Sequence, residues 1–171
     1  AALDEDRFEH AVQVLAESRH IYVLGLRSSY ALAYYLFFTL RFFAPSVRLL
    51  KPGVGDIPEQ VIGAGIEDVL ISIGFRRYTQ LTVTLTEQLK GKGVTVLSIT
   101  DSMLSPLAHL ADISLIAPTS IPSFFEAYTA PMSLINALLA SLALRWEDQA
   151  LCALNKMEFA FEDFDTYLQE E

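Results

Sequence analysis

Short apolar runs alternate with segments of helical periodicity over the first two thirds of the chain. Each run is continuous, without polar residues at every second position, a pattern typical of strands buried on both faces. The five predicted strands are HIYVLG (20–25), SVRLL (46–50), DVLISI (68–73), VTVLSI (94–99) and DISLIA (112–117). Because helical patterns separate these strands, the sequence predicts an α/β fold with a parallel sheet covered on both faces.

Helical spacing of apolar residues fills the intervals between the runs. The predicted helices cover residues 4–18, 28–43, 57–64 and 78–90. A further short helix is expected in DSMLSPLAHL, with Asp101 or Ser102 at its start.

After the fifth predicted strand the alternation ends, and only helical periodicity follows. Pro131 is expected early in the first of these C-terminal helices, or at a kink within it. Phe159, Phe161 and Phe164 lie among acidic residues near the end of the chain. This pattern predicts an amphipathic terminal helix or a surface that contacts a partner.

Length and composition favour one folded domain over residues 1–171. A chain of 171 residues is long enough to bury a substantial core, and its hydrophobic fraction of 52% excludes a disordered chain. No apolar run reaches the roughly 18 residues that a membrane-spanning helix requires. The acidic beginning, AALDEDRFEH, does not resemble a signal peptide.

Charge and cysteine content narrow the class of protein further. The formal net charge of −9 repels nucleic acid, so these residues alone are not expected to bind DNA. A single cysteine, Cys152, excludes an internal disulfide and is compatible with the reducing cytoplasm, which is the expected location. Because Cys152 lies in an apolar helical stretch, we expect it to be a packed core thiol.

Polar and cationic residues gather in the loops that follow the predicted strands. In an open parallel sheet, ligands bind beyond the carboxyl ends of the strands. Arg27, Arg76 and Arg77 lie in these loops, so the expected crevice is locally cationic in an acidic chain. The hydroxyl groups in the same loops are Ser28, Ser29, Thr79, Thr100, Ser102, Ser120 and Ser123. Hydroxyls near helix N-termini, together with arginines, favour a small anionic ligand.

Each of these residue types also has an ordinary structural role. Serine and threonine at strand-to-helix turns commonly cap helices, and a loop arginine commonly forms an ion pair. Glu126 is the carboxylate considered for general base chemistry, or else an acid in the first turn of a helix. No phosphate-binding glycine loop or dinucleotide fingerprint is present, and the three histidines do not pair by spacing. No catalytic residue, metal site or cofactor is therefore predicted.

The block SITDSMLSPLAHLADISL carries a family resemblance. With YVLGLRSSYALA, DVLISIGFRRYTQLTV and APMSLINALLASL, it resembles the sugar isomerase (SIS) domain, and more narrowly the C-terminal effector domain of RpiR-type bacterial transcriptional regulators. The resemblance extends from about residue 4 to residue 168. It implies a three-layer α/β/α, flavodoxin-like fold with a five-stranded parallel sheet and C-terminal helices. It also implies a homodimer or higher homo-oligomer and an N-terminal helix-turn-helix domain upstream of this chain.

The resemblance assigns expected roles to particular residues. Ser28 and Ser29 match the hydroxyls of the family's first loop, and Thr79 matches the threonine of its phosphate-binding turn. Ser123 and Glu126 fall in the loop that closes the family's pocket. Where the family commonly has Ser-x-Ser-Gly, this chain has GFRR at residues 74–77, so guanidinium groups partly replace hydroxyl groups.

The expected ligand is therefore a small anionic carbohydrate derivative, either a phosphosugar or a sugar acid. The function expected from the resemblance is a ligand-sensing domain of a transcriptional regulator, which contacts DNA only through the upstream domain. A sugar-phosphate isomerase with Glu126 as its base is the alternative. A purely structural dimerisation module, using the aromatic stretch ALAYYLFFTLRFF, is a third possibility.

Overall fold

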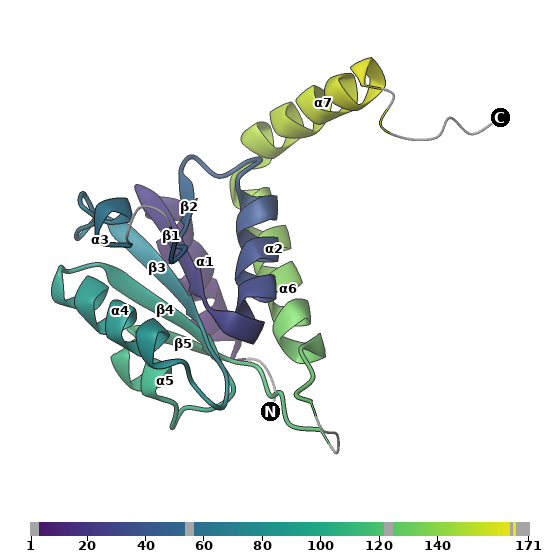
Figure 1. The fold of residues 1–171 in the computed structure, drawn as a ribbon. Coiled ribbons are helices and arrows are strands. Elements are labelled where there is room, and N and C mark those ends of the chain that lie inside the picture. Colours follow the sequence, from purple (N-terminus) through teal and green to yellow (C-terminus); the bar gives the residue numbers. More distant parts are fainter. Residues whose placement is uncertain (1–3, 54–56, 122–124, 165, 167–171) are drawn as a thin grey trace.

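A five-stranded parallel sheet forms the middle of three layers in the computed structural model, which describes residues 4–53, 57–121, 125–164 and 166 (Figure 1). The strand order is β2-β1-β3-β4-β5, and every pairing is parallel. The strands are β1 (His20–Gly25), β2 (Val47–Leu49), β3 (Asp68–Ile73), β4 (Thr95–Thr100) and β5 (Ile113–Ile116). The predicted three-layer α/β/α fold is confirmed.

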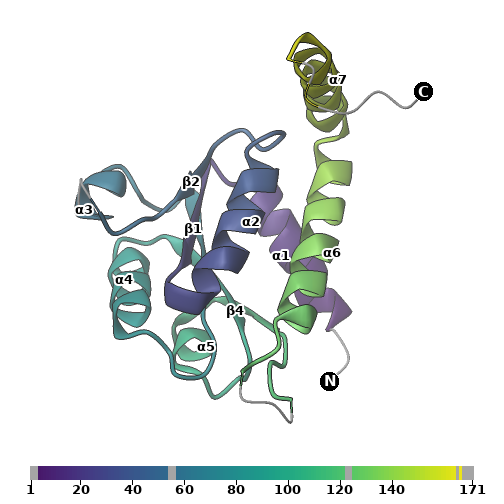
Figure 2. The same cartoon turned by 45° about the vertical axis from the view of Figure 1, so that its right-hand side comes forward.

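Helices cover both faces of the sheet (Figure 2). One face is covered by α1 (Glu5–Glu17), α2 (Tyr30–Leu40) and α6 (Thr129–Arg145), and α2 follows the short 3-10 helix η1 (Arg27–Ser29). The other face carries α3 (Ile57–Gln60), α4 (Gln80–Gly91) and α5 (Pro106–Leu110). Pro131 lies in the first turn of α6, as predicted.

Alternate side chains of the strands enter two different cores. Ile21 and Val23 of β1 pack in the core beneath α1, α2 and α6, whereas Tyr22 and Leu24 pack in the core beneath α3 and α4. Both faces of a central strand are thus covered by apolar helices, so every position favours an apolar residue. This double burial explains the continuous apolar runs in the sequence.

Element boundaries differ from the predicted ones by a few residues, for local reasons. The helix predicted at 28–43 begins later, because Arg27–Ser29 form a 3-10 turn before α2. The short helix α5 is capped by Ser105, whose Oγ accepts a hydrogen bond from the Ala108 N–H at 3.0 Å. Asp101 and Ser102, predicted at this helix start, lie in the loop before it.

The last described helix, α7 (Glu147–Asp163), projects from the three layers (Figure 1). None of its residues is buried, and Leu151, Leu154 and Phe159 are all more than half exposed. Cys152 is also exposed, so the prediction that it is a core thiol was wrong. The cause is that α7 projects from the three layers and buries no residue against the described part of the chain.

A buried tryptophan marks the junction between α6 and α7. Trp146 donates its backbone N–H to the carbonyl of Leu142 at 3.0 Å, and its ring centroid lies 6.2 Å from that of Phe43. The junction is therefore anchored in the core although the helix that follows it is not. No described helix combines the length and apolarity that crossing a membrane would require.

Candidate functional site

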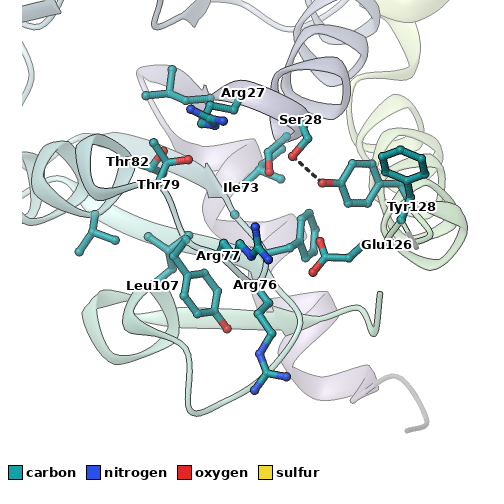
Figure 3. Close-up of a pocket in the computed structure, with 17 residues that line it drawn as sticks. Arg27, Ser28, Ile73, Arg76, Arg77, Thr79, Thr82, Leu107, Glu126 and Tyr128 are labelled. Atoms are coloured by element: carbon teal, nitrogen blue, oxygen red, sulfur yellow. Dashed lines mark hydrogen bonds between the residues drawn. The ribbon is translucent and has the colours of Figure 1, made fainter. Parts of the chain in front are cut away.

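A pocket of about 660 Å³ lies at the carboxyl end of the sheet (Figure 3). Its walls come from the loop after β1, the loop after β3 with the start of α4, and the segment before α6. These segments are distant in sequence but meet because β1 and β3 are neighbouring parallel strands. The pocket thus occupies the edge where the sequence predicted a ligand crevice.

The loop after β1 is held close to α2 by a glycine. A Cβ atom on Gly25 would lie 2.8 Å from the carbonyl oxygen of Ser29, so a larger residue would displace the backbone. Arg27 follows in the left-handed region with φ of 56°, which non-glycine residues rarely adopt. This turn places Arg27, Ser28 and Ser29 in the pocket wall.

The loop after β3 also combines a closely packed glycine with an arginine of positive φ. Gly74 leaves room for the Leu107 side chain, whose Cδ1 would lie 2.6 Å from an added Cβ. Arg77 has a φ of 32°, so both non-glycine residues with positive φ in the described chain are pocket arginines. Unusual backbone conformations of this kind are concentrated at functional sites.

The pocket arginines have no ionic partner within the described residues. Arg27, Arg76 and Arg77 line the pocket, and none of them forms an ion pair or a side-chain hydrogen bond there. The N-terminal end of α4 also faces the pocket through Thr79 and Thr82. Thr79 is the N-cap residue of α4, but its side chain makes no capping hydrogen bond. The site therefore combines open cationic groups with a helix N-terminus, which together favour an anion.

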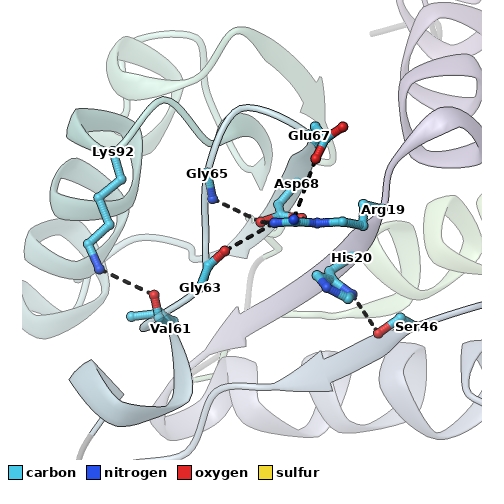
Figure 4. Close-up of polar contacts among 9 residues, drawn as sticks. All are labelled: Arg19, His20, Ser46, Val61, Gly63, Gly65, Glu67, Asp68 and Lys92. Carbon is cyan, nitrogen blue, oxygen red and sulfur yellow. Dashed lines mark hydrogen bonds and ion pairs between the residues drawn. The ribbon is translucent and has the colours of Figure 1, made fainter.

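Arg19, at the opposite edge of the sheet, has ionic partners, in contrast to the pocket arginines (Figure 4). Its Nε and Nη2 donate to the two carboxylate oxygens of Asp68 at 3.0 and 2.9 Å. The Gly65 N–H also donates to Asp68, at 2.8 Å. Burial opposes ionisation of Asp68, but the hydrogen bonds from Arg19 and Gly65 outweigh it and lower its pKa.

Glu126 brings a carboxylate to the cationic pocket from the segment before α6. Partial burial raises the pKa of Glu126, and the charge of Asp101 raises it further. Arg76 and Arg77 act in the opposite direction and stabilise its ionised form. Glu126 is thus a weaker acid than usual, and shifted pKa values of this kind cluster at functional sites.

Two tyrosines connect the loops around the pocket. Tyr128 donates a hydrogen bond from its hydroxyl to Ser28 Oγ at 2.8 Å, and its ring centroid lies 5.4 Å from that of Phe75. Tyr78 donates its hydroxyl to Asp101 Oδ1 at 2.7 Å. Burial, with the hydrogen bond and charge of Asp101, raises the pKa of Tyr78 to about 12, so its hydroxyl stays protonated at neutral pH.

The predicted site residues are only partly brought together. Those that line the pocket are Ser28, Ser29, Arg76, Arg77, Thr79 and Glu126. Thr100 and Ser102 do not line it: the hydroxyl of Thr100 donates to Asp101 at 3.3 Å, and Ser102 Oγ accepts from the Leu104 N–H at 3.1 Å. Ser123 lies outside the described residues.

Several lining residues were not identified from the sequence, chiefly Phe75, Tyr78, Thr82, Leu107 and Tyr128. Tyr128 gave a usable signal, because it stands two residues after Glu126 in the segment that follows β5. Within the described residues, no group of three His, Cys, Asp or Glu side chains could hold a metal ion.

Comparison with known proteins agrees with this architecture. The model of the SIS domain family matches residues 14–141. The sugar isomerase domain of an RpiR transcription factor from Sphaerobacter thermophilus is 26% identical, with a TM-score of 0.85 over 91% of this chain and 87% of that one. No curated protein sequence matches the chain.

Two more distant structures share the fold. The NanR protein of Vibrio vulnificus, solved with ManNAc-6P, is 16% identical with a TM-score of 0.76, over 95% of this chain and 62% of that one. A Methanococcus jannaschii protein, for which a 3-hexulose-6-phosphate isomerase function was inferred, is 12% identical with a TM-score of 0.72, over 87% of this chain and 84% of that one. A transcription-factor domain and a protein with an inferred isomerase function therefore share this architecture.

Proposed function

Because the chain belongs to the SIS domain family, we propose that it is the ligand-sensing domain of an RpiR-type transcriptional regulator and binds a small anionic carbohydrate derivative. The observation that carries this proposal is the set of three pocket arginines without ionic partners among the described residues. A phosphate or carboxylate would satisfy them through charge-assisted, bidentate hydrogen bonds.

The anion would lie between the loop after β3 and the start of α4. Arg76 and Arg77 would contact it from the loop, while Thr79 would offer a hydroxyl that the helix does not use for capping. Ser28 and Ser29 would face the sugar from the opposite loop. The likeness to the regulator domain from S. thermophilus supports a sensor, and the NanR structure shows this fold in a complex with a phosphosugar.

Signalling would require a second copy and a DNA-binding domain. We place an N-terminal helix-turn-helix domain upstream of this chain, and we propose that the domain acts as a homodimer in the cytoplasm. Binding of the ligand would favour one arrangement of the dimer and so reposition the DNA-binding domains. A ligand that binds both arrangements equally would change nothing, so differential affinity is essential.

A thermal-shift titration with glucose 6-phosphate, gluconate and inorganic phosphate tests the proposed anion site. The wild type is compared with the double variant Arg76→Gln/Arg77→Gln, and with Arg48→Gln, an exposed arginine on β2, as the control. An anion that binds should raise the Tm with concentration in the wild type and in the control but not in the double variant. An equal shift in all three proteins would show that Arg76 and Arg77 do not bind the anion.

The alternative function, a sugar-phosphate isomerase, is favoured by one observation. Glu126 lies in the pocket, and burial raises its pKa, which makes its carboxylate a stronger general base than that of an ordinary glutamate. An assay of aldose–ketose interconversion with phosphorylated sugars decides between the two functions. Turnover that is lost in Glu126→Gln would establish the enzyme and overturn the sensor.

A further inference from the structure

A second pocket of about 480 Å³ adjoins the first at the carboxyl end of the sheet. Leu26, Arg27 and Thr79 line both pockets, so the two pockets share a wall. The remaining lining residues of the second pocket are Tyr30, Lys51, Pro52 and Leu81. A ligand that reaches past Arg27 would enter this second space.

Lys51 is held in place at the rim of the second pocket. Its backbone N–H donates to Gln60 Oε1 at 3.2 Å, and Gln60 Nε2 donates to the Lys51 carbonyl at 2.7 Å. This pair of hydrogen bonds connects the end of β2 to α3 and fixes the backbone from which the lysine side chain extends. The ammonium group itself has no ion pair with any described residue.

Arg27 stands between the two pockets. Figure 3 shows it above Thr79 and Thr82, away from Arg76 and Glu126. Its left-handed backbone is unfavourable for a non-glycine residue, so this conformation is retained against a local penalty. A structural ion pair would explain the position, but no acidic residue is among the described residues that line the second pocket.

We propose that the second pocket binds a second anionic group of the same ligand. The ligand is then a carbohydrate derivative with an acidic group at each end, such as a phosphorylated sugar acid, and not a neutral sugar with one phosphate. Arg76 and Arg77 hold one group, while Lys51 and Arg27 hold the other. This inference rests on the proposed function, because it assumes that the first pocket binds an anionic sugar.

Isothermal titration calorimetry with three matched probes tests the inference. Glucose 6-phosphate carries an acidic group at one end, gluconate at the other, and 6-phosphogluconate at both. The wild type should bind 6-phosphogluconate about tenfold more tightly than glucose 6-phosphate, the factor expected for one added charge-assisted contact. Lys51→Gln should remove this advantage and leave the affinity for glucose 6-phosphate unchanged.

Two further variants separate a specific contact from general electrostatics. Lys156→Gln removes the same charge from α7 and should change neither affinity. Gln60→Ala releases the Lys51 backbone and should weaken the binding of 6-phosphogluconate selectively.

The outcomes distinguish the failure of this inference from the failure of the proposed function. Equal affinities of the two phosphorylated probes, unchanged in Lys51→Gln, would overturn the second anion site and leave the first intact. If none of the three probes binds the wild type, the proposed function fails and this inference fails with it.

Discussion

At the scale of single residues, Glu126 is the group whose protonation most directly affects an anion in the pocket. A bound anion and the ionised Glu126 carboxylate repel one another, and the raised pKa of Glu126 shows that its surroundings already disfavour the charge. Protonation of Glu126 removes this repulsion. Anion affinity should therefore rise as pH falls through the titration of Glu126.

The variant Glu126→Gln should bind an anionic probe more tightly than the wild type at neutral pH. The expected gain is about fivefold, which corresponds to roughly 1 kcal/mol of screened repulsion. Calorimetry with gluconate at several pH values measures it, because gluconate keeps one charge across the range. The gain should shrink as pH falls, since the wild-type carboxylate then becomes neutral. Weaker binding by Glu126→Gln at neutral pH would instead make Glu126 a ligand contact.

The sequence was most informative where a residue type is rare for its setting. Arg76 and Arg77 were recognised because two cations follow an apolar strand in an acidic chain, and both line the pocket. Tyr128 was missed because an aromatic residue before an apolar helix is usually core. Thr100 was predicted at the pocket but is not among its lining residues, because its side chain is fully buried, which spacing along the chain does not reveal.

At the scale of secondary structure, the two edges of the sheet have different chemistry. Cations without ionic partners among the described residues line the carboxyl edge, whereas the amino edge holds the fully buried carboxylate of Asp68 in hydrogen bonds to Arg19 and Gly65. The first arrangement suits a ligand, and the second connects the starts of β1 and β3. Strand positions were predictable because double burial demands apolar runs, but loop conformations depend on contacts such as Gly25 with Ser29.

The variant Asp68→Asn should lose stability without losing ligand affinity. Removing the charge weakens the hydrogen bonds from Arg19 and should lower the free energy of unfolding by about 1.5–3 kcal/mol. The folded-state pKa of Asp68 is lowered, so this stabilisation is present above the ordinary value of 3.8 and is lost as pH falls through the lowered one. Urea unfolding at pH 7 measures the loss of stability in the variant. Urea unfolding at acidic pH measures how far the difference between wild type and variant disappears when Asp68 is protonated. A variant as stable as the wild type at pH 7 would contradict the prediction.

At the scale of the whole molecule, α7 is the element whose stability is not explained by contacts with the rest of the described chain. An isolated helix of 17 residues is only marginally stable in water, yet α7 buries none of its residues in this chain. Leu151, Leu154 and Phe159 give it an exposed apolar side, and α2 exposes Tyr34 and Phe38. Such surfaces are typical of contacts between subunits, which supports the proposed homodimer.

The double variant Leu151→Gln/Leu154→Gln should convert the proposed dimer to monomers. Both side chains are exposed in the single chain, so the substitutions should leave the circular dichroism spectrum unchanged while removing apolar area from the interface. Sedimentation velocity at micromolar concentration measures the mass, and Lys156→Ala on the same helix is the control. An unchanged dimeric mass in the double variant would place the interface elsewhere, and a monomeric wild type would refute the dimer itself.

The position of Trp146 has a practical consequence. It is the single tryptophan of the chain, and it lies buried beside Phe43 where α6 gives way to α7. Fluorescence from selective excitation of the Trp146 indole therefore reports on the junction between α6 and α7 without any attached dye. A change in its emission wavelength or in its quenching by iodide when a sugar phosphate is added would reveal whether events at the sheet edge reach the base of the projecting helix.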